Sequence, residues 1–191
     1  MKECLLIIDA QEAWRDEKSS LFIGDLKEYV EATNKLIAWA RKNKIPIIFS
    51  LHKFKPDGSD ILKQEKGYLD DFIDGNPRAE LISDLDKKPE DIILVKNRFS
   101  FFSNLELEKI LEEKGVKEII MGGLITNCCV RATAIDAYNL EYGIIIVKEV
   151  CASGSNEIDE FTFQDLESLL FGIKIVNLEE IIKNQELRTE N

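Results

Sequence analysis

MGGLITNCCVRATAID, residues 121–136, predicts a strand, a sharp turn and a helix in direct succession. The stretch begins at the end of an apolar run, turns at Gly122 and Gly123, and becomes helical after the adjacent Cys128 and Cys129. A helix N-terminus carries partial positive charge and free backbone N–H groups, so a thiol there ionises more readily and a developing anion finds donors. We therefore predict a nucleophile site here; two buried cysteines in ordinary helix packing are the alternative.

On either side of this stretch, the chain alternates between apolar runs of strand length and amphipathic segments of helical period. This alternation predicts an α/β fold of three layers, in which a mainly parallel six-stranded sheet carries helices on both faces. No repeat, low-complexity segment or long linker divides residues 1–191, so we expect a single domain. The predicted strands are residues 5–8, 45–50, 91–95, 117–121, 143–147 and 173–176, and the other predicted helices are residues 25–44, 105–113, 159–171 and 178–187.

The regular pattern weakens between residues 53 and 90, where the turn sequences PDGS (56–59) and DGNP (74–77) occur. We expect this irregular segment, with a short helix or two, to shape a ligand pocket. Beyond it, Ser103 or Asn104 is the predicted N-cap of the helix that begins at residue 105.

Ligands of parallel α/β sheets bind outside the carboxyl ends of the strands. Polar and reactive side chains occupy several such ends in this sequence, and parallel strands bring those ends to one rim. An acid, an ammonium and a thiol are therefore expected at the same rim, although each comes from a distant part of the chain. The candidate rim residues are Asp9, His52, Lys96, Cys128, Cys129, Glu149 and Cys151.

These side chains suit nucleophilic attack on an amide-like carbonyl. A thiol must ionise to attack; Lys96 would favour the thiolate by its charge, and Asp9 would accept the proton and return it to a leaving amine. Backbone N–H groups around Ile125, Thr126 and Cys129 would hold the oxyanion. A thioester and its hydrolysis would follow. The alternative is that Asp9 is a turn cap and Lys96 belongs to a surface ion pair.

Composition narrows the class of protein. The 191 residues are 45% hydrophobic and carry a net charge of −11, which disfavours binding to nucleic acid or to an anionic membrane surface. No apolar run reaches the ~20 residues of a membrane-spanning helix. The four cysteines lack zinc-site or C-x-x-C spacing, so we expect reduced thiols and a cytoplasmic protein. A single histidine excludes a histidine-rich metal centre built from this chain alone.

Three motifs in this order resemble the isochorismatase-like cysteine hydrolases, a family that includes nicotinamidases, N-carbamoylsarcosine amidases and ureidoacrylate amidases. The resemblance covers residues 5–153. Its motifs are LLIIDAQ (5–11) with the aromatic Trp14, VKNRFSFF (95–102), and GLITNCCVRATAIDA (123–137).

The resemblance implies a catalytic triad of Asp9, Lys96 and Cys129. The family cysteine directly precedes a valine, which selects Cys129 over Cys128, and neighbours on a helix point ~100° apart, so only one of them can serve. The family's cis peptide before the motif threonine would fall between Ile125 and Thr126 and aim backbone N–H groups at the oxyanion. A homo-oligomer, a dimer or larger, is also implied.

Departures from the family pattern narrow the expected chemistry. Nicotinamidases bind a metal through an Asp and two His after the second strand, where this chain has SLHK (50–53) and no second histidine. We therefore expect no metal and no cofactor, and nicotinamide becomes a less favoured substrate. Isochorismatases proper cleave a vinyl ether without the cysteine, which Cys129 argues against. The residues expected to contact a small-molecule amide or ureido substrate are Gln11, Trp14, His52, Phe99 and Phe102.

Each of these contacts has a structural alternative. His52 suits the surface or simple packing somewhat better, and the aromatic residues suit the core or a subunit interface equally well. Two rival functions also remain open, a catalytically silent binding or scaffold protein and a thiol redox sensor that uses the vicinal Cys128 and Cys129. Alkylation of Cys129 at neutral pH and reversible oxidation of the pair distinguish them.

Overall fold

The computed structural model describes residues 2–186, and its centre is a six-stranded sheet in the order β3-β2-β1-β4-β5-β6. Every pair of neighbouring strands is parallel, which confirms the predicted sheet. Residue 187 of the last predicted helix lies outside the described residues. The strands are β1 (Glu3–Ile8), β2 (Ile47–His52), β3 (Ile92–Lys96), β4 (Glu118–Leu124), β5 (Gly143–Ala152) and β6 (Lys174–Val176).

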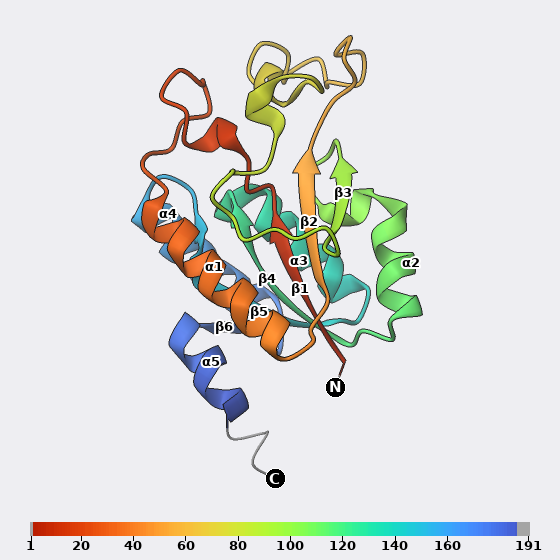
Figure 1. Cartoon of the computed structure of the whole chain (residues 1–191), viewed down its shortest axis with the longest axis vertical. Helices are drawn as coiled ribbons and strands as arrows, with labels where there is room; N and C mark the ends of the chain where they lie inside the picture. The colour runs from red at the N-terminus through yellow and green to blue at the C-terminus, as the bar shows by residue number, and fades with distance from the viewer. Residues whose placement is uncertain (1, 187–191) are drawn as a thin grey trace.

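Helices cover both faces of the sheet, as predicted (Figure 1). α1 and α5 pack on one face, and α2, α3 and α4 pack on the other. Short 3-10 turns lie at Glu12–Trp14, Asp70–Phe72, Pro77–Ala79 and Phe101–Ser103. The helices are α1 (Lys27–Lys42), α2 (Leu105–Glu113), α3 (Arg131–Asn139), α4 (Asn156–Leu169) and α5 (Leu178–Glu186).

β1 shows why a continuous apolar run forms a central strand. Side chains alternate between the two faces of a strand, and both faces of this sheet are covered. Leu5 and Ile7 pack in the core beneath α1 and α5, whereas Leu6 and Ile8 pack in the core beneath α2, α3 and α4. Burial on both sides therefore fixes the strand in place and carries the chain directly to the rim at its carboxyl end.

The two glycines of the opening motif lie inside β4, not in a turn after it. A Cβ atom on Gly122 would lie 2.4 Å from the carbonyl oxygen of Val150, and one on Gly123 would lie 2.1 Å from that of Ile8. The pairing of β4 with β5 shifts register between Met121 and Gly123. The glycines therefore allow the backbones of β1, β4 and β5 to approach closely. The prediction that the strand ends before them is wrong.

β5 is also longer than predicted, so Glu149 and Cys151 belong to the strand and do not follow it. Cys151 pairs with Gly123 across the ladder. The carboxylate of Glu149 accepts a hydrogen bond from the backbone N–H of Leu178 at 2.8 Å, which ties the start of α5 to the sheet. The prediction that both residues follow the end of the strand is therefore wrong.

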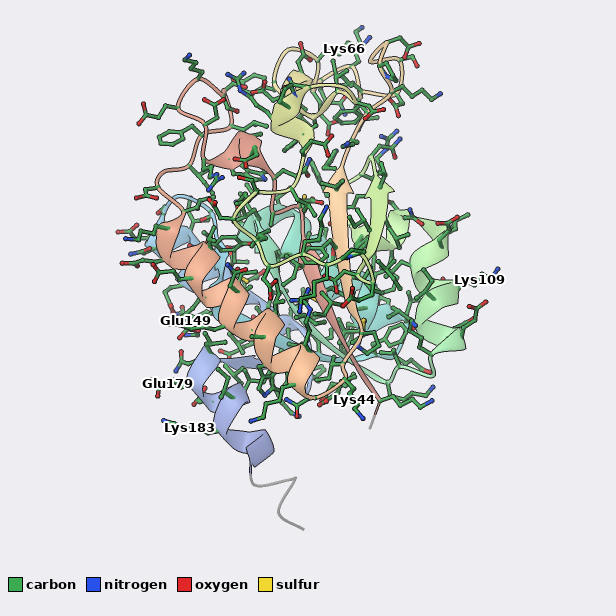
Figure 2. All side chains as sticks on the ribbon, in the orientation of Figure 1. Lys44, Lys66, Lys109, Glu149, Glu179 and Lys183 are labelled. Carbon is green, nitrogen blue, oxygen red and sulfur yellow. The ribbon has the colours of Figure 1, made fainter. Side chains whose placement is uncertain are left out.

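Residues 53–91, here called the crown segment, begin beyond the carboxyl ends of β2 and β3 and then run back to the amino end of β3 (Figure 1). Lys66 marks its outer end (Figure 2). Two backbone hydrogen bonds, each of 2.9 Å, join the segment to the turn after β1: Ile82 donates to Ala10, and Glu12 donates to Glu80. Past β3, the side chain of Asn104 caps α2 as predicted, accepting a hydrogen bond from the backbone N–H of Glu106. Among the described residues, no helix is long and apolar enough to cross a membrane.

Candidate active site

Asp9 follows β1 directly and is completely buried. Its backbone adopts a positive φ of 50°, which is uncommon for a residue other than glycine. Ser50 holds it from β2: the Ser50 hydroxyl donates to the carboxylate at 2.6 Å and accepts from the Asp9 N–H at 3.0 Å. The indole N–H of Trp14 donates to the Asp9 carbonyl at 2.9 Å. The carboxylate is therefore fixed in orientation by its surroundings.

Lys96, the last residue of β3, brings its ammonium to the Asp9 carboxylate. The distance from Nζ to Oδ2 is 2.5 Å, and both side chains are almost completely buried. The same ammonium lies 3.6 Å from the sulfur of Cys129. Burial alone would lower the pKa of Lys96, but the negative charge of Asp9, together with the contacts that the ammonium makes with Asp9 and Cys129, outweighs burial and raises the pKa above its ordinary value. Lys96 is therefore a permanent cation at neutral pH.

Cys129 completes the group from the π-helical segment Thr126–Val130, which precedes α3. The hydrogen bond with Cys128 and complete burial raise the pKa of the Cys129 thiol well above its ordinary value, although Lys96 acts to lower it. This reverses the expectation that the helix N-terminus would ease ionisation. The thiol is therefore protonated at rest, and a base must take its proton; an Asp9 oxygen lies within 4.8 Å of the sulfur.

His52, the last residue of β2, lies beside this group and not on the surface. It is 3% exposed, with Nδ1 3.3 Å from the Lys96 ammonium and 3.9 Å from the Asp9 carboxylate. Its ring stacks on Phe72 with centroids 5.3 Å apart and packs at a tilt on Phe54. Burial and the Lys96 charge lower the pKa of His52 to about 4, so the imidazole is neutral at pH 7.

The other four residues predicted to contact substrate differ in their burial and in their protein contacts. Gln11 is completely buried. Its side-chain amide forms hydrogen bonds with the backbone of His52 and Ala79, so the amide nitrogen and oxygen already have protein partners. Trp14 packs on Phe72 beneath the rim. Phe102 stacks on Tyr142, with ring centroids 6.0 Å apart. Phe99 is 46% exposed and is the predicted aromatic most open to solvent.

The non-proline cis peptide joins Leu124 to Ile125, one residue earlier than predicted. The turn that follows closes on itself, because the N–H groups of Cys128 and Val130 both donate to the Ile125 carbonyl, at 3.1 and 3.4 Å. The hydroxyl of Thr126 is buried and has no hydrogen-bond partner within residues 2–186.

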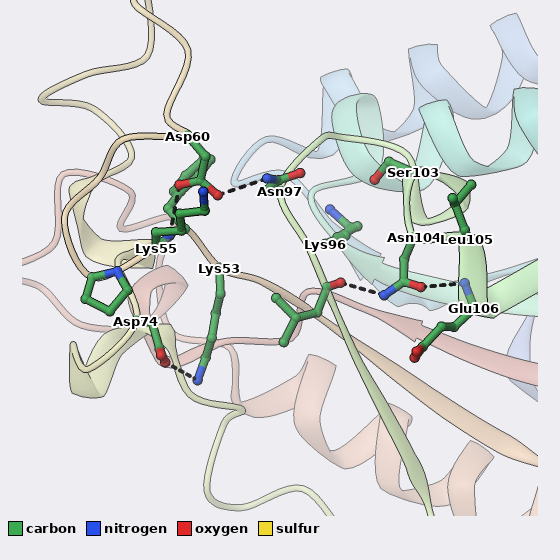
Figure 3. A pocket seen from close by; sticks show the side chains of 13 residues that line it. Lys53, Lys55, Asp60, Asp74, Lys96, Asn97, Ser103, Asn104, Leu105 and Glu106 are labelled. Carbon is green, nitrogen blue, oxygen red and sulfur yellow. Dashed lines mark hydrogen bonds and ion pairs between the residues drawn. The ribbon is translucent and has the colours of Figure 1, made fainter.

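A pocket of about 640 Å³ opens at the edge of the sheet beside β3 (Figure 3). The crown segment supplies one wall, and the segment from Lys96 to the start of α2 supplies the other. The amide of Asn97 donates to the carboxylate of Asp60 at 3.0 Å and joins the two walls. Lys96 lines this pocket, whereas Asp9 and Cys129 do not.

A sequence model described as the isochorismatase domain matches residues 3–180 of the chain. The chain belongs to the isochorismatase family. It is 25% identical over 171 residues to a maleamate amidohydrolase of Pseudomonas putida, covering 87% of this chain and 80% of the relative. It is 27% identical over 183 residues to a probable inactive nicotinamidase of Arabidopsis thaliana, covering 92% of each chain.

A solved structure has the same fold. The crystal structure of an isochorismatase family protein from Desulfovibrio vulgaris aligns with a TM-score of 0.86 at 26% identity, covering 97% of this chain and 98% of that one. The three-layer arrangement is therefore that of the isochorismatase family.

The metal of nicotinamidases does not fit the corresponding positions of this isochorismatase-family chain. The Ser50 hydroxyl is engaged with the Asp9 carboxylate, and His52 faces the Lys96 ammonium. Oxygen, nitrogen and sulfur atoms of Asp9, His52 and Cys129 lie within 4.8 Å of one another. Lys96 Nζ is in contact with all three residues, so this set of atoms already surrounds a cation, the ammonium.

Sequence reasoning missed Ser50 of β2 and gave His52 only the role of a substrate contact at this isochorismatase-family site. Ser50 and His52 are two residues apart on one strand, so their side chains project from the same face. Ser50 contacts Asp9, and His52 lies beside the ion pair of Asp9 and Lys96. The signal was present in the i, i+2 spacing of two polar residues at the end of an otherwise apolar strand.

Proposed function

We propose that this protein is a cysteine-dependent hydrolase that cleaves the C–N bond of a small-molecule amide or ureido compound through a thioester intermediate. The observation that carries the proposal is the position of Lys96, whose ammonium contacts both the Asp9 carboxylate and the Cys129 sulfur. One side chain after β1, one at the end of β3 and one after β4 thus supply an acid/base group, its counter-charge and a nucleophile in one buried cluster.

In the first half-reaction, the Cys129 sulfur attacks the substrate carbonyl while Asp9 accepts the thiol proton. Lys96 offsets the negative charge that passes from carboxylate to sulfur and then to the carbonyl oxygen. Backbone N–H groups around Ile125, Thr126 and Cys129 hold that oxygen as an oxyanion. Collapse of the tetrahedral intermediate breaks the C–N bond, and Asp9 delivers its proton to the leaving nitrogen as ammonia or an amine departs.

In the second half-reaction, water attacks the thioester, and Asp9 removes a proton from that water. The tetrahedral intermediate expels the Cys129 sulfur, which regains the proton from Asp9. The products are a carboxylic acid and the free thiol enzyme, so one water is consumed per C–N bond.

A linear or small amide fits this chain better than nicotinamide, because the Ser50 and His52 positions do not offer atoms to a metal that would hold a pyridine ring. The maleamate amidohydrolase relative acts on an amide of that linear kind by its name. The alternative function is that of a catalytically silent family member. The relative named as a probable inactive nicotinamidase supports that alternative.

A screen of small amides and ureido compounds with detection of released ammonia tests the proposal. Intact-protein mass spectrometry on acid-quenched reactions should find an acyl adduct on the peptide that contains Cys129. An adduct on another residue, or no ammonia from any compound together with an unreactive Cys129, would instead support a binding or scaffold role.

A further inference from the structure

The Lys96 ammonium has more acceptors around it than hydrogens to give. A lysine ammonium carries three N–H donors. The two shortest contacts are the ion pair with the Asp9 carboxylate at 2.5 Å and the hydrogen bond to the Arg98 carbonyl at 2.9 Å, and we assign one hydrogen to each. Two longer contacts remain for the third hydrogen, to His52 Nδ1 at 3.3 Å and to Cys129 Sγ at 3.6 Å.

We propose that His52 is a positioning residue that shares the third N–H of Lys96 with Cys129. While Cys129 is a neutral thiol, a weak acceptor, the hydrogen is held by the imidazole nitrogen. When the sulfur becomes negative, the hydrogen turns from His52 to the sulfur. No bond to hydrogen breaks in this step; only the direction of one N–H changes. The inference rests on the proposed function, because the sulfur must gain negative charge during the reaction.

The His52 ring is held in place for this role. The side-chain amide of Gln11 accepts from the His52 N–H at 2.7 Å and donates to the His52 carbonyl at 3.0 Å, so it fixes the backbone on both sides. The aromatic contacts with Phe54 and Phe72 fix the plane of the ring. A ring fixed in this way keeps Nδ1 directed at Lys96 in both states of the sulfur.

The charged groups that act on His52 keep Nδ1 free to accept. Lys96 and Arg98 oppose protonation of the ring, whereas Asp9 and Asp60 favour it. Burial and the nearby Lys96 outweigh the two carboxylates, so the ring is neutral. With Nδ1 accepting from Lys96, the ring hydrogen resides on Nε2, which is buried and has no partner in residues 2–186. The neutral imidazole therefore competes with the Cys129 thiol for the third N–H of Lys96, whereas a negatively charged thiolate binds that hydrogen more strongly than the imidazole does.

The pH dependence of Cys129 alkylation by iodoacetamide tests this role without a substrate. Site-resolved mass spectrometry separates Cys129 from Cys128, and the midpoint of the rate profile gives the thiol pKa. His52→Leu removes the competing acceptor, so among residues 2–186 the sulfur is left as the partner of the third N–H. The pKa of Cys129 should fall, and alkylation below that pKa should become about threefold to tenfold faster, the change that a pKa lowered by roughly half to one unit produces.

Two conservative variants identify the atom responsible. His52→Asn places an amide oxygen near the position of Nδ1 and should restore a profile close to wild type. His52→Gln places its amide near the position of Nε2 and should follow His52→Leu. A structural role alone predicts the opposite sign or no shift, because a more apolar surrounding raises a thiol pKa. An unchanged or raised pKa in His52→Leu, or a wild-type profile in His52→Gln but not in His52→Asn, overturns the proposal.

The failure of this inference differs from failure of the proposed hydrolysis. Alkylation reports the charge balance between Lys96 and Cys129 even when no amide is cleaved. A lowered pKa in His52→Leu without any acyl adduct on the wild-type enzyme would support hydrogen sharing and reject the hydrolase. An acyl adduct on wild-type Cys129 with identical alkylation profiles in all His52 variants would do the reverse. Thermal unfolding of each variant establishes that it is folded under the assay conditions.

Discussion

The Ser50 hydroxyl donates a 2.6 Å hydrogen bond to the carboxylate of Asp9 and accepts a 3.0 Å hydrogen bond from the Asp9 backbone N–H. One small side chain thus fixes both the backbone and the functional group of the proposed base. Asp9 needs this support, because its positive φ is not the conformation an aspartate adopts freely. Ser50 therefore belongs to the site, although it never reaches the reacting atoms.

Ser50→Ala should lower kcat by about 10- to 150-fold, the rate equivalent of the ~1.5–3 kcal/mol that a hydrogen bond to a charged group contributes. KM should change little, because substrate contacts remain. Ser168→Ala, which removes an exposed hydroxyl on α4, is the matched control and should leave both constants unchanged. A normal kcat in Ser50→Ala would mean that Trp14 and Lys96 suffice to orient Asp9.

Cys129→Ala should abolish both turnover and the acyl adduct, because the proposed nucleophile is gone. Cys128→Ala is the matched control: the same change one residue away should leave turnover and the adduct in place. The measurements are ammonia release and intact mass after acid quench. The reverse pattern, with activity lost only in Cys128→Ala, would transfer the nucleophile to the neighbouring thiol.

Lys96→Met should destabilise the protein by about 3–5 kcal/mol, because it leaves the buried Asp9 carboxylate without its counter-charge. Denaturant unfolding at pH 7 measures this loss, and turnover should disappear with it. The double variant Asp9→Asn/Lys96→Met removes both charges and should recover much of the stability while remaining inactive. Equal stability in the single and double variants would show that the pair does not interact as its 2.5 Å separation implies.

Folding stability should rise with pH between about 4 and 6.5 through His52. The folded state lowers the pKa of His52 to about 4 from the ordinary 6.5. Between those values, the unfolded chain binds a proton that the folded chain excludes, so the free energy of unfolding increases with pH, by up to about 3 kcal/mol. The contribution is complete above pH 6.5 and is lost as pH falls toward 4.

Because His52 is the only histidine in the chain, His52→Asn is a clean reference for this effect. Carboxylates titrate in the same window in both proteins, so the difference between wild type and variant isolates the imidazole. Unfolding in denaturant at several pH values from 4 to 7 gives that difference. Parallel curves for the two proteins would contradict a lowered His52 pKa.

Gly123→Ala should cost more than ~3 kcal/mol of stability, because its Cβ would enter the space of the Ile8 carbonyl oxygen, 2.1 Å away. Gly172→Ala separates this clash from backbone strain. Gly172 also has a positive φ, of 85°, but no atom lies within 4 Å of the Cβ that would be added. It should cost only the ~1–2 kcal/mol of a left-handed alanine. Similar losses in the two variants would remove the argument for close backbone approach.

Residues at strand ends were predictable, because the sequence marks where an apolar run stops. Asp9, Lys96 and Cys129 follow from that signal and from the family motifs, and the structure brings them together. The lengths of β4 and β5 were not predictable in the same way, because Gly122 and Gly123 have the composition of a turn. Their place in the strand depends on the backbones of Val150 and Ile8, which come from distant parts of the sequence.

The roles of Ser50, His52 and Gln11 required coordinates, since each acts on a partner about 40 residues away. The direction of the Cys129 pKa also depended on them. A helix N-terminus argues for a lower value, but complete burial and the hydrogen bond with Cys128 prevail. Sequence patterns show which residues are neighbours along the chain, whereas the burial and pKa of a side chain depend on its neighbours in space.

The two-residue spacing of Ser50 and His52 also limits where chain length can vary. A one-residue slip of β2 against β1 would carry Phe49 and Leu51 to the positions beneath Asp9 and Lys96, because successive side chains face opposite sides of a strand. Insertions and deletions between α1 and β2 that shift the register of β2 should therefore be selected against, even where they leave the core intact. Tolerated length differences should instead gather in the crown segment, where substrate preference can diversify while the chemistry beneath it stays unchanged.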